Sequence, residues 1–213
     1  MRKFLLIVAT LGLWSCTQTV KEKSTTSNAK DTAKVSLADN QPQIADSREK
    51  IIAELNKLSN AIAKKDKSVI LSFFDFPIAD SAVNFFEVDT VFDAKRQSNA
   101  EITKEMFSNS FNNIYELTEM AELNALFKYL NTADLIKKSH IDYTKETEDD
   151  GCSYLYGITI KGMEVYLNYG TNSNDSYRKK HPDEEEVCSE YGVNWGFKFD
   201  GEKLKFFQHR IAG

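Results

Sequence analysis

The three cysteines carry the most reactive side chains of this 213-residue chain, and their positions indicate two different uses. Cys16 directly follows an apolar run near the N-terminus, whereas Cys152 and Cys188 lie in the C-terminal third. In an exported domain the last two meet oxidising conditions, in which a structural disulfide is favoured over two free thiols. A zinc site is not favoured, because neither Cys152 nor Cys188 has a second ligand at short spacing.

The three histidines are the next candidates for chemistry. His181 lies in the run Lys-Lys-His-Pro-Asp-Glu-Glu-Glu, where a metal site is conceivable but a solvated charged loop is favoured. His140 and His209 fall at a helix-to-strand junction and on the last expected strand, from which either could face a pocket. No Gly-x-Ser-x-Gly, His-Glu-x-x-His or glycine-rich phosphate loop accompanies them. The sequence therefore assigns no catalytic residue, no metal and no cofactor.

Aromatic residues at strand spacing form the third group of candidates. Tyr154 and Tyr156 alternate along one expected strand and Trp195 and Phe197 along another, with His209 on the strand that comes next. Aromatic strands of this kind indicate core packing first and the wall of a ligand pocket second. These five side chains form the candidate pocket.

The elements that position these residues change character along the domain. The first half shows helical periodicity, beginning with a helix that Asp46 or Ser47 is expected to cap. A short second helix is expected to end before Pro77, and residues 76–92 are expected to hold one or two short strands. Thr103 is expected to cap a further helix, whose apolar pattern continues after a break near residues 112–113.

The C-terminal third instead alternates with a period of two. Residues 154–160 and 165–169 flank Lys161-Gly162, and residues 195–199 and 204–211 flank Asp200-Gly201, which predicts two β-hairpins. A further strand is expected around Ile141 and Tyr143, and a polar excursion over residues 170–186. Helices followed by an antiparallel sheet make the predicted fold class α+β.

This order of elements resembles the NTF2-like superfamily. The resemblance rests on residues 63–66 before 73–78, on the helix start at 102–107 and on the closing hairpin at 195–201, and it covers residues 48–213. It implies a cone-shaped domain in which N-terminal helices pack on a curved antiparallel sheet. Some NTF2-like enzymes use an acid and a tyrosine or histidine inside the concavity of the sheet. For that use the sequence offers Asp75, Glu87, Asp89, Tyr154, Tyr156 and Tyr166.

The N-terminal residues indicate export. Arg2 and Lys3 precede a largely apolar run of eleven residues, too short to span a bilayer, so residues 1–15 are predicted to be a signal peptide. The Leu-Trp-Ser-Cys sequence that ends at Cys16 resembles the lipobox of bacterial lipoproteins, which implies acylation of Cys16. By the same resemblance, Thr17 favours sorting to the outer membrane. Residues 16–47 are predicted to be the lipidated cysteine and a flexible tether, followed by the folded domain at 48–213.

The net charge of −5 gives no electrostatic footprint for nucleic acid. The sequence therefore favours a lipid-anchored binding module of the cell envelope, which holds a small apolar ligand or a protein partner. One alternative is an envelope enzyme that uses an acid with a tyrosine or histidine. Another is an envelope protein that inhibits a partner through its acidic segment at 183–186.

Overall fold

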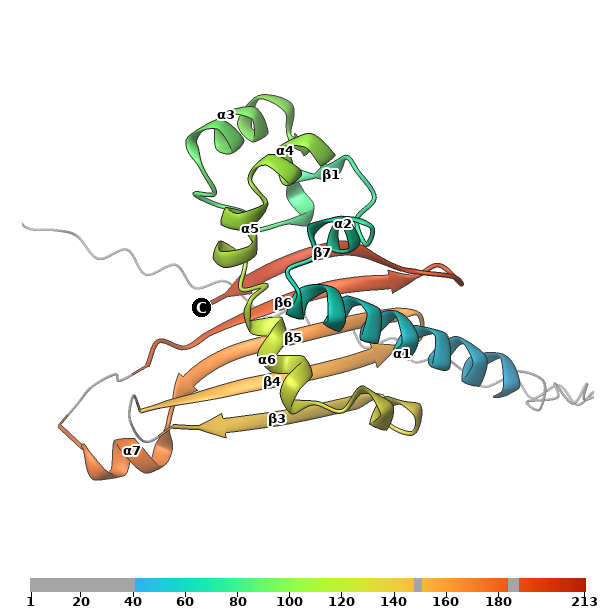
Figure 1. The fold of residues 1–213 in the computed structure, drawn as a ribbon. Coiled ribbons are helices and arrows are strands. Elements are labelled where there is room, and N and C mark those ends of the chain that lie inside the picture. The colour runs from blue at the N-terminus through green and yellow to red at the C-terminus, as the bar shows by residue number, and fades with distance from the viewer. Residues whose placement is uncertain (1–40, 148–150, 184–187) are drawn as a thin grey trace, which may run out of the picture. The chain divides into compact units, whose positions relative to one another are not determined.

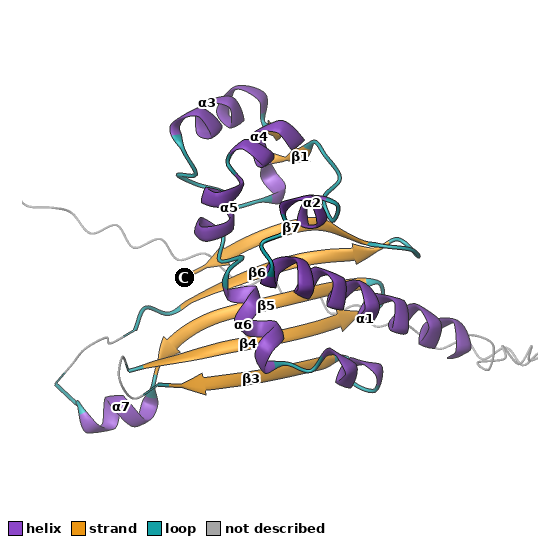
Figure 2. Ribbon diagram, viewed as in Figure 1, coloured by secondary structure: helices purple, strands orange, loops and turns teal. Residues whose placement is uncertain are grey.

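The computed structural model describes residues 41–147, 151–183 and 188–213, with side chains from residue 46 onward (Figure 1). Its main feature is a five-stranded antiparallel sheet with helices on one face, which confirms the α+β class (Figure 2). The strands pair in chain order: β3 (His140–Glu146), β4 (Cys152–Lys161), β5 (Glu164–Ser173), β6 (Tyr191–Phe199) and β7 (Leu204–Ala212). The predicted signal peptide, Cys16 and most of the predicted tether lie outside the described residues.

The helical segments mostly precede the sheet in the chain. They are α1 (Gln41–Ala63), α2 (Lys67–Leu71), α3 (Thr90–Asn99), α4 (Lys104–Asn109), α5 (Phe111–Leu117), α6 (Glu122–Tyr129), α7 (Asp175–Lys180) and the 3-10 turns η1 (Asp80–Ala82) and η2 (Thr132–Ile136). Two short strands, β1 (Ile78–Ala79) and β2 (Glu101–Ile102), pair with each other in a separate sheet. Among the described helices, none combines the length and apolar character needed to cross a membrane.

Helix α1 begins at Gln41, so the predicted cap at Asp46 or Ser47 is wrong. The helix thus extends into the segment that was predicted to be a tether. Pro42 is tolerated there because it lies in the first turn, where a missing backbone N–H removes no intrahelical hydrogen bond. The predicted apolar face of this helix is confirmed as buried: Ile51, Leu55, Leu58 and Ile62.

The helices after β2 are interrupted at two places that differ from the predicted one. Thr103 caps α4 as predicted, and its Oγ1 accepts a hydrogen bond from the backbone N–H of Met106 at 3.2 Å. The first interruption falls at Ser110 and the second at residues 118–121, not at 112–113. The second depends on tertiary structure, because the carbonyl oxygen of Thr118 accepts the indole N–H of Trp195 at 3.2 Å.

Both predicted hairpins are confirmed, and their strands are longer than the alternating patterns. Gly162 and Gly201 occupy the turns with positive φ values of 62° and 109°. The predicted polar excursion is partly wrong, because β5 continues to Ser173 and Asn174 then caps α7. The side chain of Asn174 accepts from two backbone N–H groups of α7 and donates to the carbonyl oxygen of Thr147 at 3.2 Å. A disulfide joins Cys152 to Cys188, so this end of the sheet is fixed covalently.

The core lies between the helices and the face of the sheet that they cover, here called the inner face. Phe73 and Phe85, from the segments around β1, are buried against rings of β6. Their ring centroids lie 6.4 Å from Phe197 and 6.2 Å from Trp195, respectively. Aromatic contacts at these distances stabilise the core beyond the burial of apolar area.

A β-bulge in β7 sets which side chains reach the core. Gly196 pairs with Gln208 and Phe197 with Phe206, which leaves Phe207 as an extra residue. The bulge lets both Phe206 and His209 point to the inner face although three positions separate them. Gly196 accommodates it, because a Cβ there would lie 2.6 Å from Cγ of Gln208.

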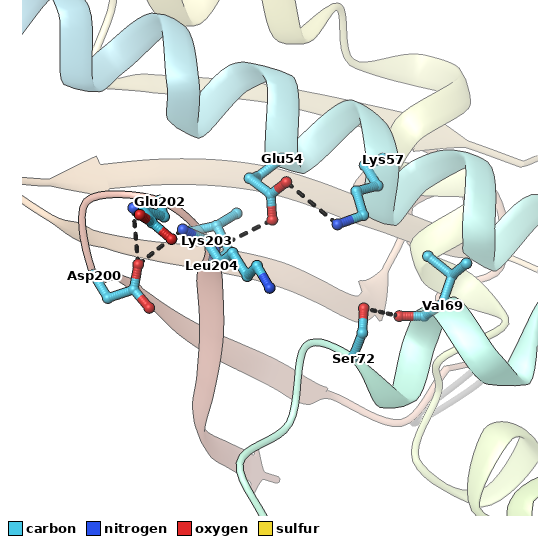
Figure 3. A network of polar contacts seen from close by, with 8 residues as sticks. All are labelled: Glu54, Lys57, Val69, Ser72, Asp200, Glu202, Lys203 and Leu204. Carbon is cyan, nitrogen blue, oxygen red and sulfur yellow. Dashed lines mark hydrogen bonds and ion pairs between the residues drawn. The ribbon is translucent and has the colours of Figure 1, made fainter.

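Two carboxylates fix the turn between β6 and β7 and join it to α1 (Figure 3). Asp200 accepts the backbone N–H groups of Glu202 and Lys203, each at 2.8 Å, and these bonds lower the pKa of its carboxyl group. Glu54 of α1 accepts the backbone N–H of Leu204 at 3.4 Å. The first helix is thereby tied to the start of the last strand.

Candidate functional site

All five side chains of the candidate pocket lie on the inner face of the sheet, but they fall into two groups. Trp195, Phe197 and His209 are at most 2% exposed. The ring of His209 lies 4.5 Å from that of Trp195 and 5.4 Å from that of Phe85, so these side chains fill the core. Tyr154 and Tyr156 lie further along β4, toward the end that carries the disulfide.

His209 is fully buried, and neither ring nitrogen has a hydrogen-bond partner within the described residues. Burial lowers the pKa of His209 to about 4, the nearby backbone of Thr118 opposes this shift, and the charge of Arg210 adds a smaller lowering. The imidazole is therefore neutral at physiological pH and out of reach of a ligand that arrives from solvent.

Three tyrosines of the inner face gather with Tyr129 of α6 and with two glutamates at or just before the start of α6. We call this group the tyrosine–glutamate cluster: Tyr129, Tyr156, Tyr169, Tyr191, Glu119 and Glu122. Its rings form a continuous series, with successive centroids 5.3, 5.5 and 5.9 Å apart. Strand register explains the gathering, because Tyr156 pairs with Tyr169 across β4 and β5, and Thr171 pairs with Tyr191 across β5 and β6.

Each glutamate accepts a hydrogen bond from one tyrosine of the cluster. The hydroxyl of Tyr191 donates to Oε1 of Glu119 at 3.3 Å, and the hydroxyl of Tyr156 donates to Oε2 of Glu122 at 3.5 Å. Within the described residues, no ion pair joins either carboxylate to a basic side chain. In the described part of the chain, the cluster therefore combines phenol hydroxyl donors with two carboxylates that are not paired with a basic side chain.

Burial and like charge shift the pKa values in this cluster in one direction. Burial raises the pKa of Glu119, and the neighbouring charges of Glu122 and Glu116 raise it further. Burial likewise raises the pKa values of Tyr156, Tyr169 and Tyr191, to which the glutamate charges add. The phenols therefore remain protonated hydrogen-bond donors near neutral pH.

Glu119 reaches the cluster from a strained backbone position. Its φ of +56° lies in the left-handed region, which is unfavourable for a residue with a side chain. Thr118 fixes the bend immediately before it, since its hydroxyl donates to the carbonyl oxygen of Ile114 and its own carbonyl accepts from Trp195. Strain of this kind persists only where surrounding contacts determine the conformation, and it is concentrated at functional sites.

The acids and the tyrosine proposed from the resemblance do not join this cluster. Asp75 forms an exposed ion pair with Lys205 at 2.6 Å, and Glu87 occupies an exposed position with a φ of +58°. Asp89 caps α3 by accepting the N–H of Phe92 at 2.8 Å, and the Ser110 hydroxyl and this bond lower its pKa. Tyr166 alternates with buried neighbours, so it lies on the opposite face of the sheet.

The two remaining histidines also lie outside the cluster. Nδ1 of His140 lies 2.8 Å from Oγ1 of Thr159, and its Nε2 lies 3.2 Å from an oxygen of the exposed Asp142. His181 stacks on Tyr177 with ring centroids 4.1 Å apart. Over the described ranges, no three His, Cys, Asp or Glu side chains are arranged to hold a metal ion.

The sequence did not single out Glu119, Glu122, Tyr169 or Tyr191. Tyr169 falls within the predicted alternation of β5, and Tyr191 continues the alternation of Val193 and Trp195, so strand periodicity places both on the inner face. No sequence signal identifies Glu119, because its position depends on the long-range contact between Thr118 and Trp195.

Comparison with protein-family models, with curated proteins and with solved structures finds no match for this chain. A function therefore has to be argued from the geometry of the tyrosine–glutamate cluster and from the sequence.

Proposed function

We propose that this chain is a lipid-anchored binding module of the bacterial cell envelope, built on an NTF2-like fold, whose ligand site is the tyrosine–glutamate cluster. Anchoring at Cys16 and sorting to the outer membrane rest on residues 1–17 of the sequence, which lie outside the described residues. The order of helices followed by an antiparallel sheet supports the NTF2-like assignment.

The observation that carries the proposal is a series of tyrosine rings with hydroxyl donors and two carboxylates beside it. Tyr191, Glu119 and Glu122 are all partly exposed, so a ligand reaches them without opening the core. Aromatic faces supply contact area, and a few polar groups placed among them fix the orientation of a ligand. A ligand with both an apolar and a polar part therefore suits the cluster better than a wholly apolar one.

Protonation favours binding over proton transfer by the tyrosines. A tyrosine acts as a base only as the phenolate, and raised pKa values oppose that form in Tyr156, Tyr169 and Tyr191. His209 is fully buried in the core, so a ligand at the partly exposed residues of the cluster does not contact its ring.

One observation favours a second candidate function, an enzyme with Glu119 as general acid. A partly buried carboxyl with a raised pKa suits that role. The inhibitor hypothesis depends on the acidic segment at 183–186, of which residues 184–186 lie outside the described residues.

Native mass spectrometry of the full chain, released from membranes in detergent, tests the proposal. We expect an added mass that is lost on denaturation and is missing from Tyr191→Ala. The matched control is Tyr166→Ala, which removes a tyrosine from the opposite face of the sheet and should retain the ligand. A bare wild-type mass, or equal retention by Tyr191→Ala, would contradict the proposal.

The same experiment separates binding from catalysis. If the chain only binds, the Glu119→Gln variant carries either the same compound as the wild type or no compound. If Glu119 acts as a general acid, the variant accumulates an unconverted compound whose mass differs from that held by the wild type.

A further inference from the structure

Within the part of the chain that the structure describes, the cluster holds two negative charges side by side without a positive charge to balance them. The backbone N–H of Glu122 donates to the carbonyl oxygen of Glu119 at 3.1 Å, so the two residues adjoin at the start of α6. Two carboxylates this close together repel each other when both are charged. The described ion pairs leave both carboxylates without a basic side chain. Such a pair gains free energy when a cation binds between its members.

The tyrosine rings beside these carboxylates indicate which kind of cation fits. An aromatic face attracts an ammonium group through the ring quadrupole and also packs against hydrocarbon. The chain already places ammonium groups on two rings, that of Tyr129 at one end of the cluster and that of Tyr154 beside it. Nζ of Lys145 lies 5.6 Å from the centroid of Tyr154, and Nζ of Lys128 lies 5.9 Å from that of Tyr129. Among the described residues, no such contact involves the rings of Tyr169 and Tyr191, next to Glu119.

A hollow of about 530 Å³ adjoins Tyr191, but it lies mainly on the other face of the sheet. Leu155, Asn172 and Gly192, which also line it, alternate with the residues of the inner face. The hydrocarbon part of a bound amine is therefore placed on the Tyr191 ring itself, while the nitrogen stays at the carboxylates.

We propose that the tyrosine–glutamate cluster binds an organic ammonium ion, with the nitrogen at Glu119 and Glu122 and the hydrocarbon part on Tyr191. This inference rests on the proposed binding function and names the ligand class. The ammonium can belong to a free amine or to a lysine side chain of a protein partner, and both present the same chemistry to the cluster.

Calorimetric titration of the full chain in detergent with hexylamine and hexanol tests the charge requirement. The two probes have the same hydrocarbon chain, and only the first carries a positive charge at neutral pH. We expect hexylammonium to bind and hexanol to bind at least about tenfold more weakly, since hydrogen bonds to charged groups are the strong ones. The variants Glu119→Gln and Glu122→Gln should each weaken the binding of hexylammonium by a similar factor of about ten. Glu105→Gln, an exposed position in α4, is the matched control and should not change the affinity.

A third probe, Nα-acetyl-lysine amide, separates the two sources of the ammonium. Affinity above that of hexylammonium indicates a lysine of a partner, and lower affinity indicates a free amine. Equal binding of hexanol, absence of hexylammonium binding at millimolar concentration, or full affinity in both glutamate variants would each overturn the assignment. If native mass spectrometry still finds a ligand that depends on Tyr191, the binding function stands and the ligand class alone is wrong.

Discussion

The His209→Leu substitution is expected to flatten the pH dependence of folding stability between about pH 6.5 and pH 4. Burial lowers the pKa of His209 from 6.5 to about 4 in the folded protein. Between these values the unfolded chain binds a proton that the folded protein does not bind, so acidification favours unfolding. The free energy of unfolding therefore decreases as the pH falls through this range, and above it His209 contributes no slope.

The size of the effect comes from the shift in pKa. Each unit corresponds to about 1.4 kcal/mol, so protonation of His209 lowers the free energy of unfolding by about 3 kcal/mol in total. Leucine has a similar size and leaves no polar atom without a partner in the aromatic core. At pH 7 the variant is therefore expected to be as stable as the wild type or more stable by about 1–3 kcal/mol.

Urea unfolding at a series of pH values, monitored by tryptophan fluorescence, measures both quantities. The titration of Glu119, whose raised pKa gives the opposite slope, is present in both proteins and cancels in the difference. Val165→Ala, another fully buried position, is a control that should lower stability equally at every pH. Parallel curves for the wild type and His209→Leu would show that His209 does not titrate as a buried group, and the reasoning would be refuted.

Three further predictions concern other parts of the molecule. Gly170→Ala should lower the free energy of unfolding by about 1–3 kcal/mol, because the added Cβ would lie 2.9 Å from the carbonyl oxygen of Tyr191. In the control Gly192→Ala, the added Cβ meets nothing closer than 3.9 Å, so denaturant unfolding should show a smaller loss of stability. Trp195→Phe removes the hydrogen bond to Thr118, which should lower the free energy of unfolding by about 1–3 kcal/mol and weaken the binding of hexylammonium. Unchanged affinity for hexylammonium would mean that this bond does not position Glu119. Cys16→Ala should move the chain from the membrane fraction to the soluble fraction, and retention in membranes would exclude acylation of Cys16 as the anchor.

Local patterns predicted the elements whose determinants lie within a few residues. The Thr103 cap and the turns at Gly162 and Gly201 have short-range signals, and the structure contains all three. The start of α1 was predicted too late. Asp46 and Ser47 are residue types that cap helices well, but such residues do not prevent a helix from beginning earlier in the chain.

The candidate site was harder to predict because its parts come together through long-range contacts. Strand alternation places Tyr156 on the inner face, but the partnership with Glu122 requires the packing of α6 on the sheet. The bend at Glu119 depends on Trp195, 76 positions later in the chain, and nothing in the local sequence encodes it. His209 points inward only because of the bulge at Phe207, which interrupts the alternation that a sequence pattern assumes.

The pairing of strands in chain order has a consequence for how the protein acquires its structure. Each neighbouring pair from β3 to β7 consists of consecutive strands, so the large sheet needs no contact between distant segments. Sheets of low contact order form quickly, because little loop-closure entropy is lost before each pairing is gained. The helices that precede them have no sheet to pack against until about the last 70 residues have been synthesised. We therefore expect the domain to fold after β7 has been synthesised, an order of events that suits the export proposed above.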